Sequence, residues 1–93
     1  MNMRIKRKAD DHFDHQRVFD FAKVELMEGI QKGDFLWYIV DNPLIAEGDE
    51  VFVPVGRANQ KTKARVVRID KKRVEGMTPV PINIAKRILG KVN

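Results

Sequence analysis

The residues most able to do chemistry are eight cations gathered in one stretch of the chain. Residues 57–73 contain eight lysine and arginine side chains against a single acidic residue, Asp70. Because ammonium and guanidinium groups bind phosphates, this stretch predicts contact with a nucleic-acid backbone, with affinity that falls steeply with salt and depends weakly on base sequence. The alternative is a charged strand that only keeps the domain in solution. The cations are Arg57, Lys61, Lys63, Arg65, Arg68, Lys71, Lys72 and Arg73.

A strand is expected to carry the middle of this stretch, with polar loops at 56–61 and 71–73. At about 3.3 Å per residue the two loops lie roughly 30 Å apart, which favours a groove along the strand over a point-like phosphate pocket. Strict alternation places Arg65 on the face of Lys63 and Arg68 on the opposite face, so one flat patch is not expected to hold them all. Trp37 and Tyr38 are candidates for stacking on bases, and a place in the core is their alternative.

Catalytic and metal chemistry find little support in the residue types. The chain has no cysteine and no serine, and Thr62 and Thr78 have no base near them in sequence. Phosphate-cradling glycine motifs are absent. His12 and His15 are three residues apart among aspartates, but a zinc site needs three or four ligands, so an acidic arm is the preferred interpretation. We therefore expect a protein that is not an enzyme and has no metal and no cofactor.

Length, charge and hydropathy favour one small domain that does not enter a membrane. The 93 residues carry a net charge of +5, but residues 1–56 hold 7 basic against 11 acidic residues, and residues 57–93 hold 11 against 2. Such asymmetry suggests a cationic surface for a polyanion. The absence of a long apolar run argues against a membrane span, and the lack of cysteine fits a cytoplasmic location.

Short alternating segments predict a mainly β protein. Residues 21–27 alternate as a strand, although a helix over 16–31 fits the spacing of their apolar side chains as well. Further strands are expected at 35–40, 50–55 and 62–70, with a possible edge strand at 3–8. Pro54 cannot donate a ladder hydrogen bond, so its strand lies at an edge or contains a bulge.

The C-terminal region is expected to contain a short α-helix over residues 82–89. Ile84 with Ile88, and Ala85 with Leu89, form an apolar stripe at helical spacing, and Gly90 follows as a cap. The predicted fold is a small, strongly bent antiparallel β-barrel of about four to six strands with this helix. Residues 1–17 form a charged N-terminal arm, and residues 18–93 form the single domain.

Residues 21–70 resemble the N-terminal DNA-binding domain of the primosomal replication-restart helicase (PriA). The resemblance rests on the order FAKVEL, FLWYIVDN, GDEVFVPVGR and ARVVRI, and its most specific part is VPVGR after GDEV. It implies a small β-barrel that recognises the 3′ end of a DNA strand at a fork. Gly56 matches the glycine beside which the terminal nucleotide sits, and Tyr38 matches the tyrosine of that family's FDY motif. Leu36 and Trp37 stand where the family has Phe and Asp, so the carboxylate that helps to hold the terminal nucleotide is missing.

Two functional hypotheses follow. The first is a non-enzymatic accessory module that contacts the backbone of single-stranded or forked DNA through the basic loop and strand. The second is a protein-interaction or assembly module of a phage or mobile element, in which an exposed strand edge or the charged arm docks a protein partner or a second copy.

Overall fold

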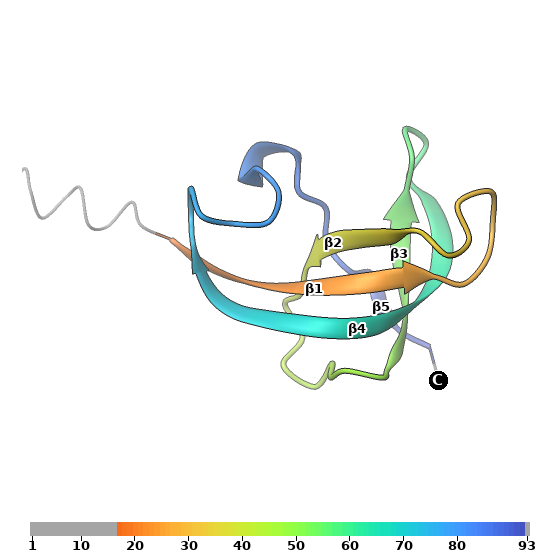
Figure 1. The fold of residues 1–93 in the computed structure, drawn as a ribbon, viewed down its shortest axis with the longest axis horizontal. Helices are drawn as coiled ribbons and strands as arrows, with labels where there is room; N and C mark the ends of the chain where they lie inside the picture. The colour runs from red at the N-terminus through yellow and green to blue at the C-terminus, as the bar shows by residue number, and fades with distance from the viewer. Residues whose placement is uncertain (1–16, 93) are drawn as a thin grey trace, which may run out of the picture.

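Five antiparallel strands form a single sheet in the part of the chain that the structure, a computed structural model, describes, residues 17–92. The strands lie in the order β2-β1-β4-β3-β5 (Figure 1). The mainly β prediction is therefore confirmed, and residues 18–26 form a strand rather than a helix. The predicted strand at 3–8, the two histidines and all of the arm except Arg17 lie outside the described residues. The strands are β1 (Val18–Leu26), β2 (Phe35–Ile39), β3 (Glu50–Val55), β4 (Gln60–Val74) and β5 (Gly90–Lys91).

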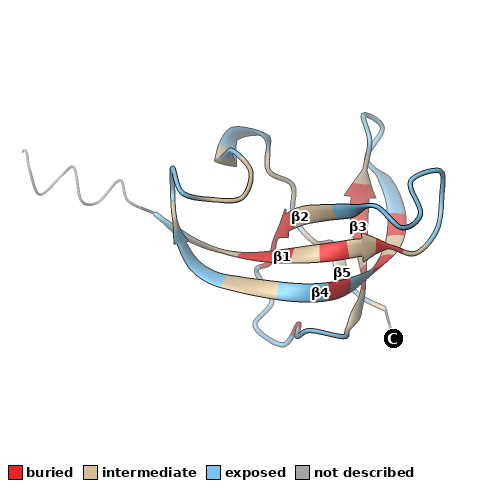
Figure 2. Ribbon diagram, in the orientation of Figure 1, coloured by how far each residue is buried: buried red, intermediate tan, exposed pale blue. Residues whose placement is uncertain are grey.

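Alternating apolar side chains build the inner face of this sheet. Val51 and Val53 of β3 are fully buried, as are Ala22 and Val24 of β1. Figure 2 shows buried segments on each of β1, β2, β3 and β4. Burying a side chain of this size contributes about 1.5–3 kcal/mol, so this cluster is the main source of stability. The core cluster is Ala22, Val24, Leu26, Tyr38, Val40, Ile45, Val51, Val53, Ala64 and Val66.

The sheet is not closed into a barrel, so that part of the predicted fold is wrong. The edge strands β2 and β5 do not pair with each other in the described residues. Instead, Ile39 of β2 forms one isolated parallel bridge with Arg87. The Ile39 N–H donates to the Lys86 carbonyl at 2.8 Å, and the Ile88 N–H donates to the Ile39 carbonyl at 3.0 Å. β5 pairs only with Val51 and Phe52, so β3 is an edge strand at Pro54, as the missing donor predicts.

The predicted C-terminal helix is also wrong. Only Ile82–Ile84 forms a single 3₁₀ turn, and Ala85 is already extended with φ −69° and ψ 140°. Eight residues are too few for a stable isolated helix, whereas the sheet edges offer backbone partners to the same segment, such as the Phe52 carbonyl for the Leu89 N–H at 2.8 Å. Ile84 and Leu89, predicted to lie on the core, are 64% and 56% exposed.

Two bulges interrupt the pairing of β4 with β1. Lys23 pairs with Arg68 while the next residue, Val24, pairs with Val66, which leaves Val67 as an extra residue in β4. The second bulge lies near the end of β4. Phe21 pairs with Asp70 and Phe19 pairs with Arg73, which again leaves one extra residue in β4. Each bulge adds one residue to β4. The side chains after the bulge therefore point to the opposite face from the one that strict alternation predicts.

No helix within residues 17–92 is long and apolar enough to cross a membrane.

Candidate nucleic-acid interface

The first bulge of β4 brings Arg65 and Arg68 onto the same face of the sheet. Arg65 pairs with Glu25 of β1, and Arg68 pairs with Lys23. Glu25 and Lys23 are two residues apart on β1, so they share a face, and directly opposed residues on neighbouring strands point to the same side. The prediction that Arg65 and Arg68 lie on opposite faces of the strand is therefore wrong. The extra residue Val67 turns the Arg68 side chain to the face that carries Arg65.

Lys61 and Lys63 continue the same line along β4. They alternate with the buried Thr62 and Ala64, so they point away from the core. Opposite them on β3 lie Pro54 and Phe52. The structure thus gathers on the outer face four of the predicted contact residues, which we call the cation row: Lys61, Lys63, Arg65 and Arg68.

A fifth cation on this face, Lys23, was not among the predicted contact residues. It lies between Trp37 of β2 and Arg68 of β4 in the register. Alternation in β1 already places Lys23 away from the core, but its position beside the cation row depends on the pairing of β1 with β4, which no local pattern reveals. The outer face of the paired strands holds six cationic side chains, Lys23, the cation row and Arg73, against three acidic ones, Glu25, Glu50 and Asp70.

Ion pairs occupy two members of the cation row. Arg65 Nη2 lies 3.4 Å from Glu50 Oε2, and Arg68 Nε lies 3.0 Å from Asp70 Oδ1. Both arginine side chains stay about half exposed or more, at 47% and 63%, so the pairs are weak and solvent-screened. Within residues 17–92 no carboxylate lies within 4.0 Å of the charged nitrogens of Lys23, Lys61 or Lys63.

The remaining predicted cations lie at the two ends of the cation row. Lys71 and Lys72 are exposed in the second bulge, where Lys72 has φ 56° and its N–H donates to Asp20 Oδ1 at 2.9 Å. The Arg73 guanidinium donates to the Met77 carbonyl, with Nη2 at 2.9 Å. Arg57 is exposed in the β3–β4 turn at the other end. Positive side chains therefore follow β4 from its turn to its last residues, interrupted by Asp70 between Arg68 and Lys71.

Aromatic rings alternate with these cations on the outer face. Lys61 Nζ lies 4.4 Å from the centroid of the Phe52 ring, and Lys23 Nζ lies 5.2 Å from that of Phe35. Trp37 is on the same face, two residues from Phe35, and is partly exposed. The mixture of planar rings and cations suits a partner that has both phosphates and bases.

Tyr38 belongs to the core, the alternative that its sequence context left open. Its side chain faces inward and the residue is 3% exposed, with the hydroxyl donating to the Pro54 carbonyl at 2.7 Å. Burial raises the pKa of this phenol. In this position the ring presents no face to a base, so Tyr38 holds β2 against β3 instead.

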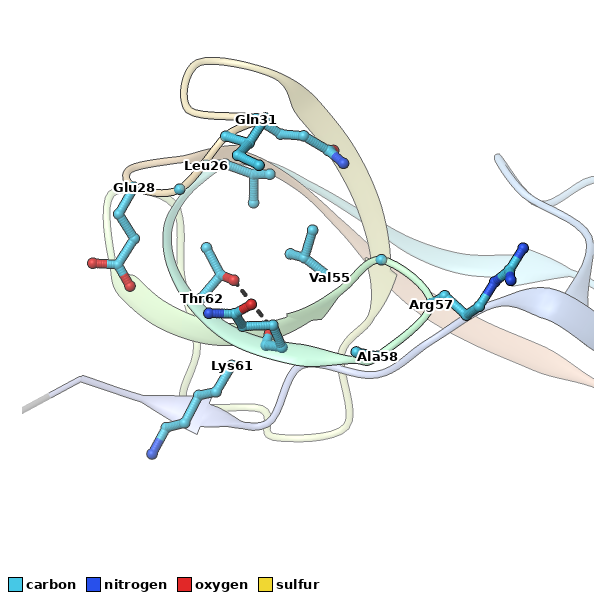
Figure 3. A pocket seen from close by; sticks show the side chains of 12 residues that line it. Leu26, Glu28, Gln31, Val55, Arg57, Ala58, Lys61 and Thr62 are labelled. Carbon is cyan, nitrogen blue, oxygen red and sulfur yellow. Dashed lines mark hydrogen bonds between the residues drawn. The ribbon is translucent and has the colours of Figure 1, made fainter.

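A hollow of about 640 Å³ opens at the end of the sheet between the β1–β2 and β3–β4 loops. Leu26, Val55 and Thr62 form its inner wall, and Figure 3 shows Lys61 and Arg57 extending away from it. The cations of this end are therefore directed to the outside of the molecule rather than into the hollow.

A second hollow, of about 270 Å³, brings together four residues compared above with the helicase domain, two that match its motif and two that depart from it. Leu36, Trp37, Tyr38 and Gly56 all line it. Gly56 has φ 75°, a left-handed conformation that favours glycine, and its carbonyl accepts a 2.8 Å hydrogen bond from Lys86 Nζ. The lining of the hollow contains no acidic side chain.

The described residues contain no group of three or more His, Cys, Asp or Glu side chains that could hold a metal ion. Comparisons of the chain with protein-family models, with curated proteins and with solved structures find no match.

Proposed function

We propose that this protein is a non-enzymatic nucleic-acid-binding module that contacts the phosphate backbone of single-stranded or forked DNA through the outer face of β4. The observation that carries the proposal is the alignment of the cation row on one face, which depends on the bulge at Val67. Arg57 and Lys71–Arg73 extend this line at its two ends. A strand of this length suits an extended polyanion better than a small phosphate ligand.

The charge on this face supports backbone contact rather than base readout. Three of its lysines have no carboxylate partner in the described residues, and the two arginine ion pairs are exposed enough to exchange Glu50 and Asp70 for phosphates. Contacts of this kind give affinity with little sequence preference and a steep dependence on salt.

The expectations that the protein is not an enzyme and that it is cytoplasmic rest on composition. A chain without serine or cysteine lacks the commonest nucleophiles. The absence of cysteine also fits a reducing compartment.

A salt-titrated binding comparison tests the proposal. Fluorescence anisotropy with single-stranded, duplex, 3′-tailed and RNA probes should show binding at about 50 mM salt that weakens linearly in log K against log salt, with a slope near −0.7 for each phosphate neutralised on a single strand. Failure to bind any of these probes at that salt concentration would overturn the proposal.

A protein-interaction or assembly module is the second candidate, favoured by exposed apolar side chains outside the cation row. Ile30 at the β1–β2 turn and Leu44 in the β2–β3 loop are 104% and 76% exposed. Sedimentation across a range of protein concentrations separates the two candidates. A self-associating species that binds no nucleic acid would favour this second one.

A further inference from the structure

Phe35 is an exposed aromatic ring on the face that carries the cation row. It is the first residue of β2, lies opposite Glu25 in the register and is 53% exposed. The core is already filled from the inner face, so this ring is not needed to complete it. Lys23 Nζ, 5.2 Å from the ring centroid, places a positive charge beside an accessible aromatic plane.

Trp37 adds a second ring beside the first. Phe35 and Trp37 are two residues apart on one strand, so they point to the same side and are separated by about 7 Å along β2. Successive bases in a duplex strand are about 3.4 Å apart. Neighbouring bases that stacked on both rings would have to separate from each other, which a single strand can do at small cost and a paired duplex cannot.

The register connects these rings to the positive charge of β4. Trp37 pairs with Lys23, which pairs with Arg68, and Phe35 pairs with Glu25, which pairs with Arg65. Strands in a sheet lie about 4.8 Å apart, so the rings and the cation row are about 10 Å from each other across β1. A chain whose backbone follows the cation row therefore has its bases within reach of the rings.

We propose that Phe35, with Trp37 and Lys23, forms a base-stacking platform that makes this face selective for single-stranded over duplex nucleic acid. The proposal rests on the proposed function, because the cation row must hold the backbone for the bases to reach the rings. DNA and RNA strands share the required chemistry.

Substitution of Phe35 tests the platform. Phe35→Leu keeps an apolar side chain but removes the aromatic plane, and stacking on one ring is worth about 1–3 kcal/mol per base. We expect at least about fivefold weaker binding to a thymidine or uridine strand of about 20 nucleotides, with duplex binding and the salt slope unchanged. Phe35→Trp should retain single-strand binding. Leu44→Ala, which truncates an exposed apolar residue away from this face, is the matched control.

Trp37 gives an independent measurement because it is the single tryptophan of the chain. Its fluorescence should be quenched by single strands and not by duplex at equal saturation. Three outcomes have distinct meanings. If Phe35→Leu binds single strands as the parent does, or if duplex binds as tightly as single strands, the platform is disproved while the proposed function stands. If no nucleic acid binds, both fail. If Trp37 is quenched by single strands and Phe35→Leu is selectively weakened, both are supported.

Discussion

The inner and outer faces of this sheet differ in composition and in what each can do. The inner face is filled by small aliphatic residues such as Val24, Val53 and Val66, which are at most 1% exposed. The outer face has cations, partly exposed rings and solvent-screened ion pairs, although Phe21 and Ile39 on the same face are buried, at 0% and 3% exposed. Stability therefore depends mainly on the inner face, and the exposed part of the outer face can carry charge at little cost to the fold. The two properties should be separable by mutation.

The largest expected effect comes from placing a charge on the inner face. Val66→Asp buries a carboxylate among apolar side chains without a partner and should cost more than about 4 kcal/mol, enough to unfold a domain of ordinary stability. Circular dichroism during urea or thermal denaturation measures the loss.

Val67→Asp is the matched control, because Val67 is the next residue, stands in the bulge and is 37% exposed. Its fold should persist. Equal destabilisation by the two variants would contradict the assignment of faces on either side of the bulge.

A charge reversal on the outer face should have the next largest effect, on binding alone. Lys61→Glu with Lys63→Glu replaces two attractions to phosphate by two repulsions, at a cost of about 2–4 kcal/mol of binding free energy at low salt. Anisotropy measures the affinity and thermal denaturation the stability, which should change little. Lys32→Glu, in the β1–β2 turn, should affect binding much less. Equal losses from the turn and from the cation row would mean that only the net charge matters.

The hydroxyl of Tyr38 should make a smaller contribution, to stability only. Tyr38→Phe removes the donor to the Pro54 carbonyl, a buried contact of 2.7 Å, and leaves that carbonyl without this partner. We expect a loss of about 1–2 kcal/mol in the free energy of unfolding, measured by urea denaturation. Nucleic-acid affinity should not change, and a clear loss of affinity would contradict the inward position of this ring.

The smallest expected effect is on the acid stability of the β2–β3 loop. The pKa of Asp49 is lowered first by the hydrogen bond from the Ala46 N–H to its Oδ2 and then by Lys91, whose Nζ lies 3.3 Å away. A carboxyl with a lowered folded-state pKa stabilises the fold above the unfolded value, about 3.9, and loses this contribution as pH falls through the folded value. Asp49→Asn should therefore lower the melting temperature near neutral pH, and the difference should shrink below about pH 4. A constant difference across this range would exclude the electrostatic origin.

Alternation in sequence was enough to predict β1 to β4 and the inner face, but not β5, where Gly90 was expected to cap a helix. The β1 pattern of Ala22, Val24 and Leu26 and the β3 pattern of Val51 and Val53 each point to one buried side, because a strand has a period of two. The missing donor of Pro54 predicted either an edge or a bulge, and the structure has an edge there. These features depend on single residues and their immediate neighbours.

Features that depend on pairing between strands could not be predicted in the same way. Nothing in the run of Val66, Val67 and Arg68 distinguishes a bulge from a regular strand, since no glycine or proline marks it, so Arg68 was placed on the wrong face. The helical spacing of Ile84 and Ile88 gave a wrong prediction for a similar reason. The edges of β2 and β3 offer this segment backbone hydrogen bonds, and these favour an extended chain over a short helix. Lys23 and Phe35 were not predicted as contact residues. They lie beside the cation row only because β1 pairs with both β2 and β4, and no local sequence pattern reveals this pairing.

Backbone amide NMR during titration with a thymidine oligonucleotide can locate the residues of this protein that nucleic acid contacts. If nucleic acid binds the outer face, we expect the largest chemical-shift changes on outer-face residues of β1, β2 and β4, including Lys23, Phe35, Lys63 and Arg68. Changes confined to the loops around the hollow at Ile30 and Ala58, or no changes at saturating oligonucleotide, would contradict it.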